Sequence, residues 1–346
     1  MSWSRPSLDG TAAESTGVKV LFGREQISAD LAWDQLAQHL PGWELASCAP
    51  SKVADNLDGV DVICPFGARI TAPIMAAGSF GLVHQFGVGL DGVDIATATA
   101  LGVLVARVPG DAGGNADSCA ELAVLHLLAL ARRLDESRTV LAERRWPDRP
   151  VGRSLLDATV LIVGLGAIGV ALARRLAPFG SRLLGVRARP ELGGPREVEL
   201  VGGPDQLPDL LAQADAVVCC ALLHDGNGQM FGQAEFAAMK PGALFVNVAR
   251  GGLVDEAALL AALDSGQVGG AGLDVFAREP ADPQAPLVSH PHVIATPHVG
   301  WHTGYMFRQT SEVFAANLRR FGRGELPLWT VNEPAFRRPQ QLRRPE

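Results

Sequence analysis

Residues 159–169 read TVLIVGLGAIG, in which a β-branched, apolar run leads directly into a GxGxxG pattern. The run predicts a buried strand, residues 167–177 predict a helix, and residues 182–186 predict a second strand. In this context the three glycines are typical of a turn that binds a dinucleotide. The first permits the tight turn, the second lets the backbone approach a pyrophosphate, and the third lets helix and strand pack closely. We therefore expect a cofactor-binding loop, rather than a purely structural glycine-rich turn, at Gly164, Gly166, Ala167, Ile168 and Gly169.

Strand and helix signals alternate along the chain, which predicts an α/β architecture with parallel sheets and crossover helices. Strands are expected at 18–22, 60–64, 82–86, 103–108, 159–163, 182–186, 216–220, 244–248, 270–275 and 293–296. Helices are expected at 28–39, 95–100, 115–134, 167–177, 234–239 and 255–263. The first four strands form one α/β unit and the later strands form a doubly wound sheet. The helix at 115–134 joins them, either as a spine between domains or as an ordinary core helix.

The composition limits the classes of protein to which the chain can belong. Its 346 residues suggest about two domains, and 47% hydrophobic against 19% charged residues exclude a disordered chain. The 30 basic and 37 acidic residues give a net charge of −7, which argues against nucleic-acid binding because phosphates need a basic face. The most apolar long stretch, 119–131, carries Glu121 and His126 and is too short to cross a bilayer. The N-terminus lacks the apolar region of a secretory signal.

The five cysteines form no C-x-x-C pair, and most lie in apolar runs: Cys48, Cys64, Cys119, Cys219 and Cys220. We interpret them as small buried hydrophobic side chains of a protein in a reducing cytoplasm. Their spacing is not that of metal ligands, so no metal site is expected. Residues 1–16 and the tail after about residue 336 are expected to be loose chain ends.

The residue that ends the second strand of a dinucleotide-binding unit faces the adenosine ribose, where NAD-dependent enzymes place Asp or Glu. This chain has Arg187 there, followed by Ala188 and Arg189. A carboxylate would repel a 2′-phosphate, whereas two guanidinium groups can bind it bidentately. The sequence therefore predicts NADP(H) as the preferred cofactor, with NAD(H) possible. The alternative is a basic loop with two solvated arginines.

Three of the later predicted strands are followed by residues that can act on a substrate: Arg250, Glu279 and His298. Because parallel strands end at one sheet edge, these residues are expected where a nicotinamide ring would project. Arg250 suits the carboxylate and keto oxygen of a 2-keto acid, and His298 suits proton donation near neutral pH. A hydrogen bond from His298 to the Glu279 carboxylate would favour the imidazolium form and extend reduction to higher pH. Each residue alone also fits a structural role, but three at successive strand ends indicate a site.

Six stretches of the chain together carry a family resemblance: FGVGLDGVD (86–94), NADSCAELA (115–123), VGLGAIG (163–169), NVARGGLVDEAAL (247–259), GLDVFAREP (272–280) and TPHVG (296–300). Over about residues 18–334 the chain resembles the D-isomer-specific 2-hydroxyacid dehydrogenases, most of all the NADPH-dependent glyoxylate/hydroxypyruvate reductases. The resemblance implies two Rossmann-like, doubly wound parallel-sheet domains with a cleft between them. A discontinuous, flavodoxin-like substrate-binding domain would comprise 1–110 plus 301–346, and the dinucleotide-binding Rossmann domain 111–300. Family members are usually homodimers through the cofactor domain.

The resemblance also implies roles for individual residues, with Arg250, Glu279 and His298 as the catalytic trio. Substrate contacts are expected from Gly87, Val88, Gly89, Arg250, His298 and Trp301, where the amides of Val88 and Gly89 bind the carboxylate. Further cofactor contacts are expected from Leu222, Asn227, Val248, Ala249, Arg250, Asp274, His298 and Gly300. The implied reaction is hydride transfer between NADP(H) and a small 2-keto or D-2-hydroxy acid.

The chain departs from the family pattern at several positions. The segment LLH (222–224) replaces Pro-Leu-Thr, and Asn227 replaces a threonine, so backbone contact with the cofactor is the safer expectation there. Trp301 would narrow the pocket, and Trp146 resembles a tryptophan that some reductases send into the partner's active site; packing is the alternative for both. Glu279 argues against a formate-type dehydrogenase, which pairs the histidine with Gln. A phosphite-type dehydrogenase and a dinucleotide-sensing corepressor stay open as alternatives.

Overall fold

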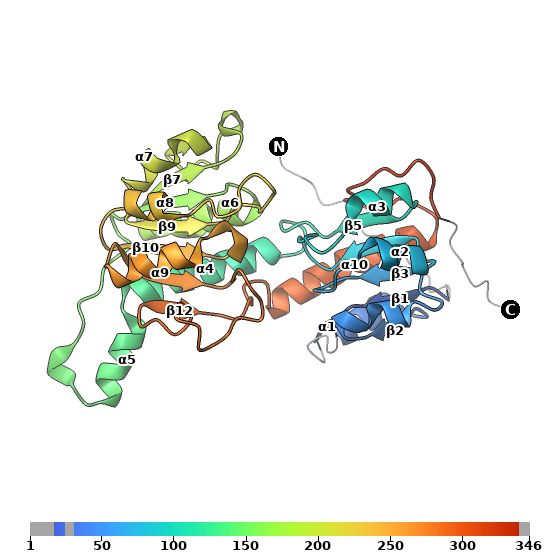
Figure 1. The fold of residues 1–346 in the computed structure, drawn as a ribbon, viewed down its shortest axis with the longest axis horizontal. Coiled ribbons are helices and arrows are strands. Elements are labelled where there is room, and N and C mark those ends of the chain that lie inside the picture. The colour runs from blue at the N-terminus through green and yellow to red at the C-terminus, as the bar shows by residue number, and fades with distance from the viewer. Residues whose placement is uncertain (1–16, 25–30, 339–346) are drawn as a thin grey trace. The chain divides into compact units, whose positions relative to one another are not determined.

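The computed structural model describes residues 17–24 and 31–338, so the expected loose segment 1–16 and the first three residues of the helix expected at 28–39 lie outside the described residues. The chain divides into two compact units (Figure 1). Unit 1 consists of Met1–Asn115 and Thr303–Glu346, and unit 2 consists of Ala116–His302, so both chain ends belong to unit 1. Each unit is built on a parallel sheet covered by helices, which confirms the predicted α/β fold class.

The sheet of unit 1 has the strand order β2-β1-β3-β4-β5. Its strands are β1 (Lys19–Phe22), β2 (Glu44–Ser47), β3 (Val62–Cys64), β4 (Leu82–Gln85) and β5 (Leu104–Arg107). Its helices are α1 (Leu31–His39), α2 (Ala72–Ala77), α3 (Ile95–Ala100) and α10 (Gly304–Gly322). The sequence does not predict β2 or α2. β2 is an edge strand without buried residues, and α2 has only six residues, so neither has a clear apolar period.

The C-terminal segment of unit 1 is held by side-chain hydrogen bonds to backbone groups. Asn332 is buried and bonds the backbone at the start of β5. Arg338 donates at 2.7–2.9 Å to three carbonyl oxygens near the ends of α2 and α3, those of Met75, Gly78 and Leu101. The expectation of a loose tail after about residue 336 is therefore wrong as far as residue 338, because unpaired helix-end carbonyls bind this guanidinium.

The sheet of unit 2 has the strand order β12-β11-β10-β9-β6-β7-β8. Its strands are β6 (Thr159–Val163), β7 (Arg182–Val186), β8 (Leu200–Gly202), β9 (Ala216–Cys219), β10 (Ala243–Asn247), β11 (Val268–Leu273) and β12 (Val293–Ala295). Its helices are α4 (Asn115–Ala131), α5 (Leu134–Ala142), α6 (Ala167–Leu176), α7 (Leu207–Leu211), α8 (Gln233–Ala238) and α9 (Glu256–Asp264). The chain winds outward in both directions from β6 and β9. In such sheets ligands bind at this switch point, outside the carboxyl ends of the strands.

Both faces of the unit 2 sheet are buried, which explains the continuous apolar run in β6. Val160 and Ile162 pack in a layer with α4 and α6, whereas Leu161 and Val163 pack in the opposite layer with α7, α8 and α9. Four of the five cysteines are buried and only Cys48 is partly exposed, so the expectation of small buried hydrophobic side chains is confirmed for those four. Among the described residues, no helix has the length and apolar character needed to span a membrane.

Helix α4 is shorter than the predicted helix at 115–134, which is a correction to the sequence-based boundary. The helix ends at Ala131, whose carbonyl oxygen accepts the N–H of Arg153 at 2.7 Å. Arg133 then adopts a left-handed conformation with φ of +49° before α5 begins. A backbone partner from a segment 22 residues away ends the helix, and the local sequence carries no signal of it.

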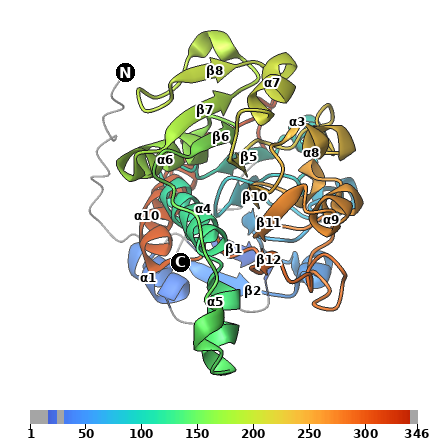
Figure 2. The same cartoon turned by 90° about the vertical axis from the view of Figure 1, so that its left-hand side faces the viewer.

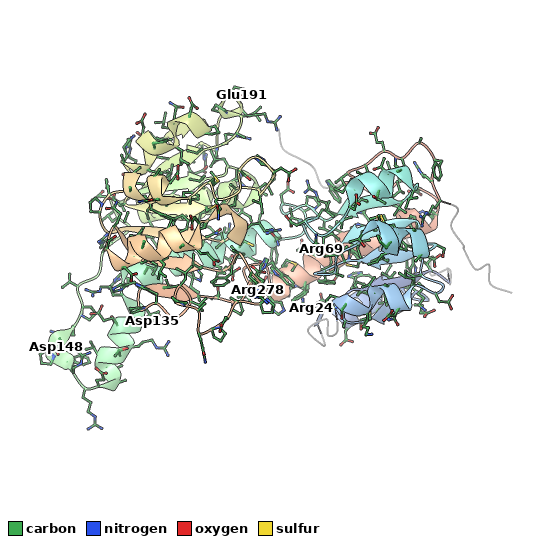
Figure 3. All side chains as sticks on the ribbon, viewed as in Figure 1. Arg24, Arg69, Asp135, Asp148, Glu191 and Arg278 are labelled. Carbon is green, nitrogen blue, oxygen red and sulfur yellow. The ribbon has the colours of Figure 1, made fainter. Side chains whose placement is uncertain are left out.

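Residues 134–151 form an arm that extends away from the sheet of unit 2 (Figures 1 and 2). The arm consists of α5 and a short 3₁₀ turn at Trp146–Asp148, and Asp135 and Asp148 mark it in Figure 3. Val140 of the arm is buried, but three of its large apolar side chains are strongly exposed, with 62% for Leu141, 62% for Trp146 and 86% for Val151. An exposed apolar group of this kind is typical of an interaction surface.

Candidate active site

The glycine loop between β6 and α6 has the geometry of a phosphate-binding turn. Gly164 has φ of +104°, and a Cβ there would lie 2.5 Å from the backbone nitrogen of Ala221. A Cβ on Gly169 would lie 2.1 Å from the carbonyl oxygen of Gly164, so α6 packs directly on the loop. Gly166, which caps the N-terminus of α6, has no heavy atom within 4 Å of the place where its Cβ would stand. The loop thus leaves open space at the positive end of α6, which fits a dinucleotide pyrophosphate.

The end of β7 carries an arginine whose side chain is held in place. Arg187 is half-buried, and its Nη1 donates to the carbonyl oxygen of Gly193 at 2.6 Å. Arg189 is exposed at the start of the next turn, in the loop that Glu191 marks in Figure 3. No carboxylate stands at the end of β7 itself. The hydrogen bond to Gly193, which the sequence does not predict, fixes the Arg187 guanidinium at the strand end.

Residues 222–227 form a turn after β9 that is closed by its own side chains. Asn227 accepts the N–H of His224 at 2.8 Å and donates to the carbonyl oxygen of Leu222 at 2.8 Å. The Nδ1 atom of His224 accepts the N–H of Gly226 at 3.1 Å. Both polar atoms of the Asn227 side chain are therefore used within the turn, while the Leu222 side chain is 70% exposed. A cofactor contact by either residue stays a prediction.

The strand end at β10 positions Arg250 through its neighbours. The buried Asn247 accepts the N–H of Ala249 and donates to the carbonyl oxygen of Arg250, both at 3.0 Å. The next residue must be glycine, because a Cβ on Gly251 would lie 1.9 Å from the carbonyl carbon of Phe276. Asn247 and Gly251 are functional supports that the sequence analysis missed; they belong to the segment NVARG, whose family match is the only signal for them.

His298 and Glu279 are in direct contact at the edge where β11 and β12 end. The Nδ1 atom of His298 lies 2.7 Å from Oε2 of Glu279, and the two side chains are 36% and 37% exposed. The other carboxylate oxygen of Glu279 accepts the N–H of Phe276 at 3.1 Å. Partial burial raises the pKa of Glu279, but the hydrogen bonds from His298 and Phe276 and the charges of His298 and Arg250 outweigh it, so its pKa lies below the ordinary value. Glu279 is therefore an ionised acceptor that orients the imidazole.

The loop that carries His298 is anchored on a buried carboxylate at the end of β11. Asp274 is 2% exposed and accepts the N–H of Val299 at 2.9 Å and that of Gly300 at 2.8 Å. The N–H of His298 donates to the carbonyl oxygens of Asp274 and Thr296. These bonds hold His298 at φ of +54°, a region that only a few non-glycine residues adopt. Asp274, predicted as a cofactor contact, thus has a structural task that the sequence analysis missed.

The remaining predicted residues are distributed over both units. Val248, Ala249 and Gly300 are buried beside the trio in unit 2, and Trp301 is partly buried with its ring 5.1 Å from that of His302. In unit 1, Gly87 follows β4 with φ of +146°. In the described part of the chain, the N–H groups of Val88 and Gly89 have no hydrogen-bond acceptor. Two free amides beside a flexible glycine suit the oxygens of a carboxylate.

The profile of the D-isomer specific 2-hydroxyacid dehydrogenase NAD binding domain matches residues 124–300, about half of the chain and most of unit 2. The chain belongs to the D-isomer-specific 2-hydroxyacid dehydrogenase family. This confirms the family resemblance of the sequence and the expectation of an enzyme of this family.

Three similar proteins of known sequence or structure illustrate the activities found in the family. The glyoxylate reductase of Korarchaeum cryptofilum is 35% identical over 263 residues, which cover 75% of this chain and 78% of that protein. The D-3-phosphoglycerate dehydrogenase of Mycobacterium tuberculosis is 38% identical over 260 residues, 75% of this chain, but this chain spans only 48% of that relative. The NADPH-dependent glyoxylate/hydroxypyruvate reductase of Sinorhizobium meliloti, solved with NADP and malonate, matches with a TM-score of 0.77 and 29% identity over 93% of this chain and 99% of its own.

Proposed function

We propose that the chain reduces a small 2-keto acid to a D-2-hydroxy acid with NADPH, as glyoxylate/hydroxypyruvate reductases do. The observation that carries the proposal is the 2.7 Å contact between His298 and Glu279 at the sheet edge that also bears Arg250. An imidazole held by an ionised carboxylate is suited to donate a proton to an alkoxide that forms next to it. A bound nicotinamide cofactor supplies the hydride that reduces the keto carbon.

Each residue of the trio has a distinct proposed role. Arg250 binds the substrate carboxylate and keto oxygen through its planar guanidinium. His298 donates its Nε2 proton to the alkoxide oxygen, while Glu279 holds Nδ1 and stabilises the charged ring. In the oxidative direction the same atoms act in reverse, and His298 takes the proton of the hydroxyl group.

We propose NADP(H) over NAD(H) because two arginines, and no carboxylate, follow β7. The bond from Arg187 to Gly193 supports the proposal, since an oriented guanidinium loses less entropy when it binds a phosphate. Arg187→Ala should lower kcat/KM with NADPH by about tenfold or more, the value of a charge-assisted hydrogen bond, with little change for NADH. Arg196→Ala in the same loop is the control, because this side chain is 94% exposed and, within the described ranges of the chain, its ion-pair partner is the neighbouring Glu197.

A panel of 2-keto acids tests the reaction itself. Purified protein is assayed for oxidation of NADPH, and separately of NADH, with glyoxylate, hydroxypyruvate, pyruvate and 3-phosphohydroxypyruvate. We expect turnover of the first two with a preference for NADPH. Turnover of 3-phosphohydroxypyruvate alone would place the chain with the phosphoglycerate dehydrogenases instead. Tight dinucleotide binding without turnover of any keto acid would contradict the proposal and favour a sensor.

We further propose that the chain forms a homodimer through unit 2, and that the arm takes part in the contact. Leu141, Trp146 and Val151 of the arm expose apolar surface that a second copy would cover. Light scattering should report a dimer for the native chain and a monomer for Leu141→Asp. Leu192→Asp is the control, because that leucine is similarly exposed at 55% but lies outside the arm. A native monomer, or a dimer in Leu141→Asp, would contradict this assembly.

A further inference from the structure

A buried histidine on α4 touches the network that anchors the catalytic loop of unit 2. His126 is 1% exposed, and its Nε2 lies 3.3 Å from Oγ1 of Thr296. The Thr296 hydroxyl donates its one hydrogen to Oδ1 of Asp274 at 2.7 Å. Thr296 can therefore only accept from His126, which assigns the proton of the ring to Nε2. The result is a directed chain of hydrogen bonds from His126 through Thr296 to Asp274.

The other ring nitrogen of His126 gains nothing from its position. Nδ1 is buried and has no hydrogen-bond partner among the residues that the structure describes. The ring packs against Gly272 of β11, where a Cβ would stand 2.8 Å from Nδ1. Burial lowers the pKa of His126, and the opposing effects of the Asp274 charge and of a weak contact with the Gly272 backbone are smaller, so the ring is neutral at neutral pH. An apolar side chain would avoid burying an unpaired nitrogen, so the useful part of the ring is the Nε2–H group.

The far end of this chain of bonds is the backbone that holds His298. The Asp274 carboxylate that accepts from Thr296 also accepts the N–H groups of Val299 and Gly300. His298 itself keeps a positive φ of +54° that needs such support. Without the N–H group of His126, the Thr296 side chain is free to rotate. Rotation weakens its hydrogen bond to Asp274, one of the three that the Asp274 carboxylate accepts. Misalignment of a proton donor lowers the rate of the chemical step more than it lowers binding.

We propose that His126 is a positioning residue for the reaction, which acts through Thr296 and Asp274 on the loop that carries His298. The inference rests on the proposed proton-donor role of His298. His126 does not touch substrate in this scheme; it fixes the Thr296 hydroxyl and, through it, the direction of the His298 imidazole. The residue couples α4 to the end of β12, two elements that are 170 positions apart in the sequence at this contact.

Three variants separate this role from simple packing. His126→Leu removes the donor and keeps an apolar side chain, His126→Gln keeps an N–H donor, and Leu127→Met changes a neighbouring buried residue of α4 that has no polar partner. In NADPH-linked reduction, His126→Leu should lower kcat about fivefold, the value of one neutral hydrogen bond, with KM nearly unchanged. His126→Gln should recover most of this loss, and Leu127→Met should keep the native kcat.

Amide hydrogen exchange gives a readout that does not depend on activity. Exchange at Val299 and Gly300 should be faster in His126→Leu by about fivefold, because the Asp274 carboxylate holds them less firmly. It should be unchanged in Leu127→Met. Native exchange rates and native kcat in His126→Leu would overturn the proposal. If the native chain reduces no 2-keto acid, the proposed function fails, and the exchange data alone decide whether His126 positions the loop.

Discussion

Alanine substitutions at two glycines of the loop after β6 should have different effects, one on stability and the other on cofactor affinity. In Gly169→Ala the new methyl carbon would lie 2.1 Å from the carbonyl oxygen of Gly164 and 3.2 Å from Cγ2 of Ile162. The oxygen belongs to the backbone at the end of β6, so the clash is relieved only if α6 moves away from the sheet. Such overpacking costs about 1–3 kcal/mol. For a unit of this size each kcal/mol lowers Tm by about 2–4 °C.

Gly166→Ala should leave stability unchanged and weaken cofactor binding. The backbone at Gly166 has φ of −83° and ψ of −161°, which alanine adopts without strain, and a Cβ there meets no atom within 4 Å. The methyl group would instead fill the space where the pyrophosphate approaches the N-terminus of α6. Loss of one charge-assisted hydrogen bond from a backbone amide raises Kd for NADPH by about tenfold or more.

Both variants are measured in the same two assays. Thermal unfolding without cofactor gives Tm, and isothermal titration with NADPH gives Kd. We expect Gly169→Ala to lose stability and Gly166→Ala to lose affinity at native Tm. Native affinity in Gly166→Ala would refute the assignment of the loop as the pyrophosphate site. Native Tm in Gly169→Ala would refute the contact of α6 with the loop.

Two further predictions concern the stability of unit 1. Burial lowers the pKa of His84 to about 4, partly offset by its bond to the Gln85 carbonyl, so below about 6.5 the unfolded chain binds a proton that the folded chain does not. Stability should therefore fall by up to about 1.4 kcal/mol per pH unit as pH decreases from 6.5 toward 4. Urea unfolding at several pH values measures this slope, and an equal slope in His84→Gln would contradict it. Arg338→Ala should lower the free energy of unfolding by about 1–3 kcal/mol, because the hydrogen bonds to three carbonyl oxygens are lost. Arg337→Ala is the control, because that side chain is exposed. Equal urea midpoints for the two variants would refute the anchoring role of Arg338.

The sequence predicts the elements whose burial is continuous and local. β6 and β7 have the bounds that the sequence predicts, because both faces of these strands are covered. β6 is followed by Gly164 and β7 by Arg187, and each of these residues has an expected role in cofactor binding. Short edge elements are missed, as in β2 and β8, because four and three residues are too few to show a clear apolar period. The end of α4 is also missed, because the bond from Arg153 to Ala131 is a tertiary contact.

The candidate site could also be predicted only in part. The order of strands places Arg250, Glu279 and His298 at one sheet edge, so their approximate position follows from topology alone. Their supports do not follow, because Asp274 acts on backbone groups about 25 residues further along the chain. The sequence gives no sign of a role for His126, which is a polar residue in the largely apolar stretch 119–131. Only its contact with Thr296 in the structure suggests one.

The kcat of a His298 variant tests the central claim most directly. Asn is the suitable replacement, because it tolerates the left-handed backbone of this residue and cannot act as a general acid at neutral pH. In NADPH-linked reduction of glyoxylate, His298→Asn should lose about 10²–10⁴-fold in kcat, the usual contribution of a general acid, while Kd for NADPH stays near the native value. A kcat close to the native value in a folded variant would contradict the assignment of His298 as the proton donor.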